Sequence, residues 1–209
     1  PDIKEFWGNP FTAIKKHTKS WWEHAKQPVT LRPQILFAVG VILYLVVHFW
    51  GLTKFPIYFS CDEAVNPVLA NNLVRDDLKS YDGELLPTFF RNGGQYCIST
   101  SVYAQLPVVL LFGKSVFATR AAFALISTLT AFWVGFALRD IFKNRLWWLA
   151  PYVLTIIPAW FLLSRTAFEY SLQVTFFSGF LYYYLCYRKT DPRAIYPAIV
   201  CGALSFYSY

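Results

Sequence analysis

The amino-acid sequence predicts an all-α protein that crosses a membrane with several helices. Of its 209 residues, 56% are hydrophobic and only 15% are charged. A water-soluble domain has about 25% charged residues, and a disordered chain needs low hydrophobicity. Two further observations favour a membrane protein: several apolar runs are long enough to span a bilayer, and the basic residues gather on one side of them.

The stretch 1–34 precedes the first apolar run and is rich in lysine and aromatic residues. The chain starts at Pro1 without a Met and ends at Tyr209 inside an apolar run, so we expect the N-terminal part of a longer protein. In 1–34, apolar residues recur at helical spacing with lysines between them, which predicts a basic amphipathic helix on the inner leaflet. A solvated tail is the alternative, and no cleavable signal peptide is expected.

Five apolar runs between residue 35 and the end of the chain predict the transmembrane domain, 35–209. A spanning helix needs about 20 mainly apolar residues. The runs that meet this need are 35–52, 116–138, 146–163, 170–187 and 194–209. A sixth run, 102–112, is about half that length, and we interpret it as a helix that lies at the interface or re-enters the protein.

The distribution of charge predicts the orientation, because Lys and Arg concentrate in cytoplasmic loops. With the N-terminus inside and five spans, the inner segments hold 12 of the 19 basic residues and 5 of the 12 acids. The inner side then carries the whole net charge of +7, and the outer side is neutral. The positive charge is therefore a feature of topology, and we expect no nucleic-acid partner.

The predicted outer loop, 53–115, carries half of the acidic residues of the chain. Asp62 and Glu63 come about ten residues after the first span, where a helix is expected from Ala64 onward. Spacing alone favours capping of that helix by these acids, and the alternative is a carboxylate at the membrane edge that acts as a general base. The two roles are compatible.

Two Gly-containing sites later in the loop predict turns or hairpins, at Asp82–Gly83 and Gly93–Gly94. Asp82 is a secondary candidate for the site, although a turn-forming role is favoured. Asp76 and Asp77 are most simply explained as solvated acids on a helix.

Three charged residues are expected close to the hydrocarbon on the outer side. Arg165 and Glu169 are four residues apart, so on one helix they share a face and pair. Arg120 lies about one turn into the second predicted span, where a guanidinium suits a phosphate at headgroup depth. For the Arg165–Glu169 pair, a structural role and a functional role remain open.

The order of several short motifs resembles a known family. Asp62-Glu63-Ala64 opens the outer loop and is followed by YDGELLPTFFRNGGQY, SVYAQLPVVLLFGKSVFATRAAFAL, IIPAWFLLSRTAFE and GALSFYSY. From Ile35 to Tyr209 the chain resembles the N-terminal part of the GT-C membrane glycosyltransferases. The similarity is to the protein-mannosyltransferase-like branch, which includes the lipid A aminoarabinose transferases.

The resemblance implies an inverting glycosyltransferase that uses a polyprenyl-phosphate sugar donor on the extracytoplasmic side. Asp62 would be the base or acceptor-orienting carboxylate, with Glu63 beside it. Arg120 would contact the donor phosphate, and Arg165 and Glu169 would face the same cavity. The acceptor would be a lipid, a glycan or a protein, in the cytoplasmic membrane of a prokaryote or, alternatively, the endoplasmic reticulum membrane.

The chain departs from the family at residues 96–99, where Tyr-Cys-Ile-Ser stands in place of a Lys-Pro-Pro or His-Pro-Pro element. No His, Cys and Asp cluster has convincing metal-ligand spacing, so no cofactor is predicted. Cys61 and Cys97 both fall in the outer loop, where a disulfide is chemically permitted. A non-enzymatic membrane protein, such as a transporter or a complex-assembly domain, is the alternative function.

Overall fold

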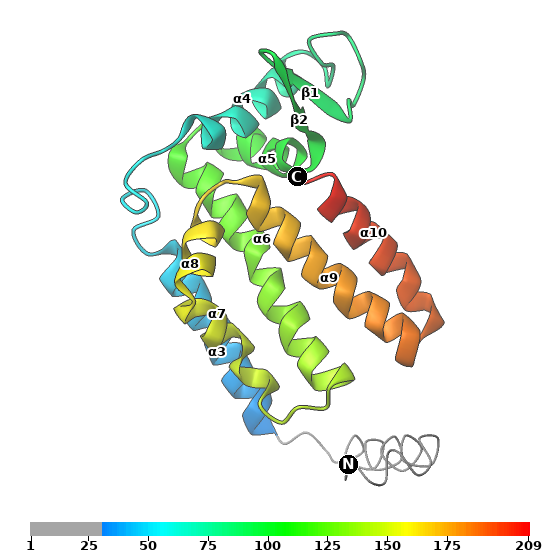
Figure 1. Ribbon diagram of the computed structural model, residues 1–209. Coiled ribbons are helices and arrows are strands. Elements are labelled where there is room, and N and C mark those ends of the chain that lie inside the picture. The colour runs from blue at the N-terminus through cyan, green and yellow to red at the C-terminus, as the bar shows by residue number, and fades with distance from the viewer. Residues whose placement is uncertain (1–30) are drawn as a thin grey trace.

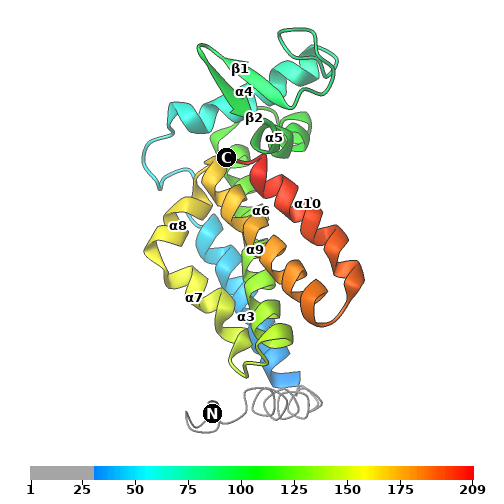
Figure 2. The same cartoon turned by 45° about the vertical axis from the view of Figure 1, so that its right-hand side comes forward.

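Five helical segments run side by side as a bundle in the computed structural model, which describes residues 31–209 (Figures 1 and 2). The chain is mainly helical, as the all-α prediction requires. The bundle consists of α3 (Leu31–Phe49), α6 (Val116–Phe136), α7 (Ala150–Ile156) with α8 (Pro158–Arg165), α9 (Glu169–Lys189) and α10 (Ile195–Phe206). Short non-α turns are Ala137–Ile141, Trp147–Leu149 and Pro192–Ala194. The amphipathic helix predicted within 1–34 falls almost entirely outside the described residues.

The loop between α3 and α6 folds into a small unit at one end of the bundle (Figures 1 and 2). It consists of α4 (Cys61–Arg75), β1 (Phe89–Asn92), β2 (Gln95–Ile98) and α5 (Ser99–Phe112). Its core is formed by residues of α4, β1 and α5: Ala70, Leu73, Phe90, Val102 and Val109. The apolar run 102–112 is therefore the greater part of α5, which packs against α4.

Both turns predicted in this unit are confirmed. β1 and β2 pair antiparallel with Asn92 opposite Gln95, so Gly93 and Gly94 form the connection. Gly93 has a φ of 60°, which a glycine adopts without steric cost. The second turn runs from Ser80 to Glu84, and Gly83 donates its N–H to the Ser80 carbonyl at 2.9 Å.

Polar side chains connect the helices of the bundle at its centre. The Tyr44 and Ser127 hydroxyls lie 3.0 Å apart, and the indole N–H of Trp160 donates to the Tyr44 oxygen at 3.0 Å. Thr130 of α6 donates to Thr175 of α9, also at 3.0 Å. Small residues and interhelical hydrogen bonds of this kind are typical of helices that pack in a membrane.

The third predicted span, 146–163, is a broken helix rather than a continuous one. α7 ends at Ile156, and α8 starts at Pro158 with its axis turned by 77°. Proline lacks the N–H that a continuing helix needs and disfavours the helical conformation of the residue before it. Ile157 accordingly has an extended ψ of 113°.

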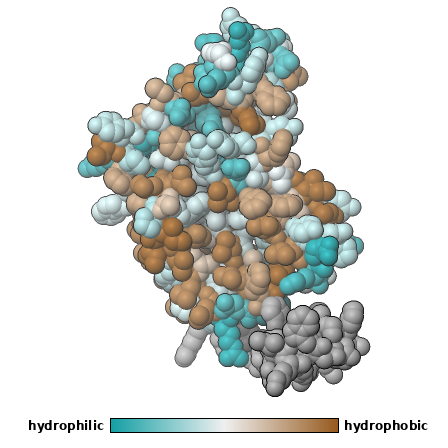
Figure 3. All heavy atoms as spheres, viewed as in Figure 1, coloured by the Kyte–Doolittle hydropathy of each residue, from teal (hydrophilic) through white to brown (hydrophobic). Residues whose placement is uncertain are grey.

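The apolar character of the described helices is uneven. Among residues 31–209, Val116–Ile141 is the one helix long and apolar enough to cross a membrane, and the bent pair α7–α8 would make a second. Pro33–Phe49 and Ser99–Phe112 are shorter apolar helices. Figure 3 shows hydrophobic side chains gathered over the bundle and hydrophilic ones toward the β-hairpin end. The five-span arrangement stays a prediction.

Candidate functional site

The segment between α3 and α4 is held by Arg120, which is 1% exposed. Its Nη1 donates to the carbonyl oxygens of Leu52 at 3.0 Å and Pro56 at 2.9 Å. Its Nη2 donates to the Tyr58 carbonyl at 2.8 Å. The remaining two N–H groups go to Glu63, so all five donors of the guanidinium are used.

Arg165 holds the same segment from the other side. Its guanidinium donates to the carbonyl oxygens of Val47 and Trp50, both at 2.7 Å, and to that of Phe55 at 2.9 Å. The last carbonyl groups of a helix have no partner within the helix, and here Arg165 supplies one at the end of α3. Arg165 is 2% exposed, and its guanidinium lies over the Phe161 ring.

Glu63 accepts four hydrogen bonds and is 1% exposed. Oε2 accepts from Arg120 Nε at 2.8 Å and from the backbone N–H of Ala167 at 3.1 Å. Oε1 accepts from Arg120 Nη2 at 2.9 Å and from the Ser60 N–H at 3.4 Å. The carboxylate therefore joins the start of α4, the first turns of α6 and the α8–α9 connection.

Ser60, rather than Asp62, is the N-cap of α4. Its hydroxyl accepts from the Glu63 N–H at 3.2 Å, and its own N–H donates to the Glu63 carboxylate, which makes a capping box. The helix consequently starts at Cys61, three residues earlier than expected. The Ser-x-x-Glu spacing of Ser60 and Glu63 is the sequence signal that predicts this capping box.

The Asp62 side chain is thereby left without a structural partner among the described residues, and it is exposed. It occupies the second position of α4, while Glu169 is the first residue of α9 and is half-buried. Burial raises the pKa of the Glu169 carboxyl, the Asn66 amide opposes this, and the negative charge of Asp62 adds to the rise. Asp62 and Glu169 therefore lie close enough to interact electrostatically.

Asn66 lies one turn after Asp62 on the same helix and is fully buried. Its Oδ1 accepts from the Ser101 hydroxyl at 3.0 Å, whereas its Nδ2 has no partner within 3.5 Å among the described residues, although the amide is near enough to Glu169 to oppose the rise in its pKa. Cys97 of β2 is near the same acids: burial raises the pKa of its thiol, and the charge of Glu169 adds to this. Cys61 and Cys97 are free thiols here, so the disulfide permitted by the sequence is not formed.

The other predicted site residues, Arg165, Arg120 and Asp82, do not form a common site with Asp62. Arg165 and Glu169 form no ion pair, because the chain leaves the helical conformation between them at Thr166. Arg120 has no free N–H for a phosphate, since every donor is engaged within the protein. Asp82 lies on the turn at 80–84 and faces Arg91 at 4.0 Å, in an exposed pair.

No group of three or more His, Cys, Asp or Glu side chains in the described part of the chain is arranged to hold a metal ion. Comparisons of the chain with protein-family models, with curated proteins and with solved structures give no match. The site consists of two carboxylates, Asp62 and Glu169, at the starts of α4 and α9. The buried Glu63–Arg120 ion pair lies beside them.

We expect Glu63→Gln and Arg120→Lys each to lower the free energy of unfolding by about 3–5 kcal/mol, because each leaves a buried charged or polar partner unsatisfied. Arg120→Lys keeps the charge but loses donors to three backbone carbonyls. Thermal unfolding followed by circular dichroism measures the loss. Arg75→Lys, in an exposed ion pair with Asp76, is the matched control and should leave the midpoint unchanged. An equal change in unfolding midpoint for Arg75→Lys and Arg120→Lys would contradict the structural role of Arg120.

Glu169 should make stability fall as the pH rises. Because its folded-state pKa is raised above the unfolded value, its ionisation on going from pH 4 to pH 7 costs stability. Glu169→Gln removes that cost, so its unfolding midpoint relative to the unsubstituted protein should be higher at pH 7 than at pH 4.

Asp76→Asn provides a control of opposite sign. Hydrogen bonding to Arg75 lowers the pKa of Asp76, so this carboxylate contributes stability that is lost as the pH falls. The midpoint of Asp76→Asn relative to the unsubstituted protein should therefore be lower at pH 7 than at pH 4. If the relative midpoint changes in the same direction between pH 4 and pH 7 for both variants, the environment assigned to Glu169 is wrong.

Proposed function

We propose that this chain is part of a GT-C membrane glycosyltransferase that moves a sugar from a polyprenyl-phosphate donor to an acceptor at the extracytoplasmic face. The observation that carries the proposal is the exposed, unpartnered carboxylate of Asp62 beside the half-buried carboxylate of Glu169. The motif resemblance, from Asp62-Glu63-Ala64 to the end of the chain, supports the same class.

The chemistry of this transfer requires one carboxylate that accepts a proton from the acceptor hydroxyl. The acceptor oxygen attacks the anomeric carbon, the bond to the phosphate oxygen breaks, and the lipid phosphate leaves with the electron pair. A phosphate leaves without needing a proton, so no general acid is required. Attack from the face opposite the phosphate inverts the anomeric configuration, with Asp62 taking the proton.

Glu169 is proposed to bind and orient the acceptor rather than to take the proton. With its raised pKa, its carboxyl is suited to hydrogen bonding with a hydroxyl group. Glu63 and Arg120 are proposed as positioning residues. They fix the start of α4 so that Asp62 projects from a rigid helix end.

The donor phosphate requires a cation, and Arg120 and Arg165 are engaged with backbone carbonyls and Glu63. Their proposed contribution is therefore to the shape of the loop from Trp50 to Ser60, and another cation would meet the phosphate.

The membrane arrangement is part of the proposal: five crossings, the N-terminus inside and the unit of α4, α5 and the hairpin outside. The distribution of basic residues supports this orientation. The membrane crossings themselves are supported by large exposed apolar side chains on the bundle, including Ile42 at 60%, Leu125 at 59% and Ile199 at 60% exposure. An exposed apolar surface of this kind is typical of a protein that contacts lipid.

Asp62→Asn should reduce sugar transfer by at least about 100-fold while the protein still folds and inserts. The assay uses the full-length protein in membranes with a panel of radiolabelled polyprenyl-phosphate sugars. Asp77→Asn, an exposed acid beyond the C-terminal end of α4 that does not line the site, is the matched control and should keep its activity. Unchanged turnover of Asp62→Asn would exclude it as the base.

Cys61, next to Asp62 and exposed, reports the orientation directly. A membrane-impermeant maleimide should label it in sealed right-side-out vesicles and not in inside-out vesicles. Cys61→Ser should abolish the labelling, which identifies the modified thiol. Labelling confined to inside-out vesicles would reverse the proposed topology.

A further inference from the structure

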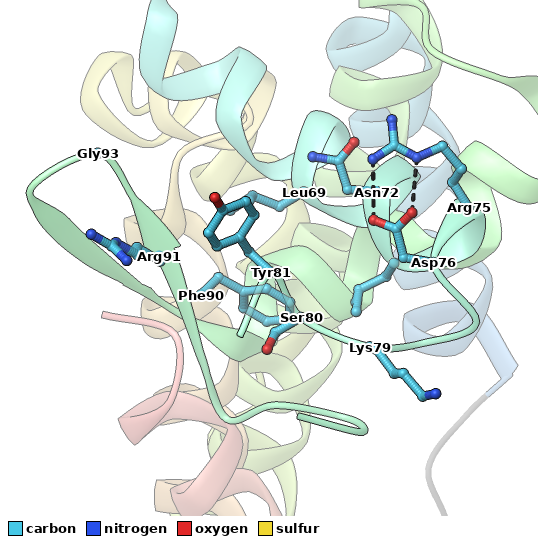
Figure 4. Close-up of a pocket in the computed structure, with 11 residues that line it drawn as sticks. Leu69, Asn72, Arg75, Asp76, Lys79, Ser80, Tyr81, Phe90, Arg91 and Gly93 are labelled. Carbon is cyan, nitrogen blue, oxygen red and sulfur yellow. Dashed lines mark hydrogen bonds and ion pairs between the residues drawn. The ribbon is translucent and has the colours of Figure 1, made fainter. Parts of the chain in front are cut away.

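A cavity lies on the unit formed by α4, α5 and the hairpin, away from Asp62, and the proposed transfer step does not use it. Its volume is about 420 Å³, within the range of about 300–1,000 Å³ typical of small-molecule sites. It lies between the C-terminal end of α4, the turn at 80–84 and strand β1 (Figure 4). Arg75, the last residue of α4, lies about 20 Å from Asp62 at the rise of an α-helix.

Aromatic rings occupy the middle of this cavity. Figure 4 shows Tyr81 beside Phe90, with the Arg75–Asp76 pair on one side and Arg91 on the other. Phe90 is buried at 3% exposure as part of the core, whereas Tyr81 is 89% exposed. The Tyr81 hydroxyl has no hydrogen-bond partner among the described residues. Its exposed ring can therefore pack against the apolar face of a ligand.

The polar side chains around these rings carry a net positive charge. Arg75, Lys79 and Arg91 line the cavity, and Asp76 is the one acid among its described lining residues, while Asp82 faces Arg91 at 4.0 Å from outside the lining. Asp76 is already held by Arg75 through two hydrogen bonds of 2.9 and 3.1 Å. Asn72 adds an amide, which both donates and accepts. Lys79 has no side-chain partner among the described residues and is exposed.

The segment that presents Tyr81 and Lys79 is fixed by the backbone. Asp77 and Leu78 have φ values of 53° and 62°, which L-residues rarely adopt, and Leu86 has a φ of 50°. The Leu78 N–H donates to the Leu73 carbonyl at 2.7 Å, and the Leu86 N–H donates to the Leu78 carbonyl at 2.9 Å. Backbone hydrogen bonds therefore fix both ends of the segment that carries Lys79 and Tyr81. Less backbone conformational entropy is then lost when a ligand binds these side chains.

We propose that this cavity binds an anionic saccharide, which on the proposed function is a remote part of the acceptor. A sugar ring offers an apolar C–H face to Tyr81 and hydroxyl groups to Asn72 and Asp76. An acidic group on the saccharide pairs with Lys79, and it replaces the exposed 4.0 Å contact of Arg91 with Asp82. Binding energy from a remote part of a substrate helps to position the reacting hydroxyl, here at Asp62.

The test measures binding of galacturonic acid oligomers to the full-length protein by isothermal titration calorimetry. Neutral galactose oligomers of the same length and inorganic phosphate are the comparison ligands. Tyr81→Ala and Lys79→Gln should each weaken binding of the acidic oligomer by about tenfold. The matched controls are Tyr58→Ala, a tyrosine at 85% exposure outside the cavity, and Lys114→Gln, an exposed lysine outside it, and both should bind normally.

Equal binding of the neutral oligomer would overturn the requirement for an anion, and equal binding of phosphate alone would overturn the saccharide. Unchanged binding by both cavity variants would overturn the site. Asp62→Asn should keep full binding of the acidic oligomer. If Asp62→Asn retains transfer activity while Tyr81→Ala loses binding, the proposed function fails and the cavity assignment stands.

Discussion

The buried ion pair between Glu63 and Arg120 organises the end of the bundle that meets α4. Removing two charges from water is costly, and their attraction compensates only if the remaining hydrogen-bonding capacity is also satisfied. Here the carboxylate accepts four hydrogen bonds and the guanidinium donates all five of its own. The pair therefore joins the α3–α4 connection, the start of α4, α6 and the α8–α9 connection.

The positions of Asp62 and Glu169 follow from this pair. Glu63 fixes the first turn of α4, which leaves the preceding residue, Asp62, pointing away from the buried side. The contact between Glu63 and the Ala167 N–H brings the start of α9 to the same place, two residues before Glu169. A buried carboxylate with a structural role thus lies directly beside an exposed one that has no partner among the described residues.

The sequence supports the helical class, the hairpin at Gly93–Gly94 and the turn at Asp82–Gly83, because these depend on local composition and on glycine conformation. Arg120, Arg165, Glu63 and Glu169 are unusual in the sequence because they are charged residues beside apolar segments, and all four lie at the end of the bundle that meets α4. The partners of Arg120, Arg165 and Glu63 include backbone carbonyls and a backbone N–H of distant segments, such as Leu52 and Ala167, and no local pattern reveals such contacts. The break at Pro158 and the capping box at Ser60 were readable from local motifs.

The most direct measurement of the central claim is a double-mutant cycle of Glu63→Gln and Arg120→Met, read as thermal unfolding at pH 7. Each single variant leaves one buried charge without its partner, whereas the double variant leaves none. The account predicts that the double variant is no less stable than either single variant. Losses that simply add would contradict it, because they would mean that the two side chains act independently.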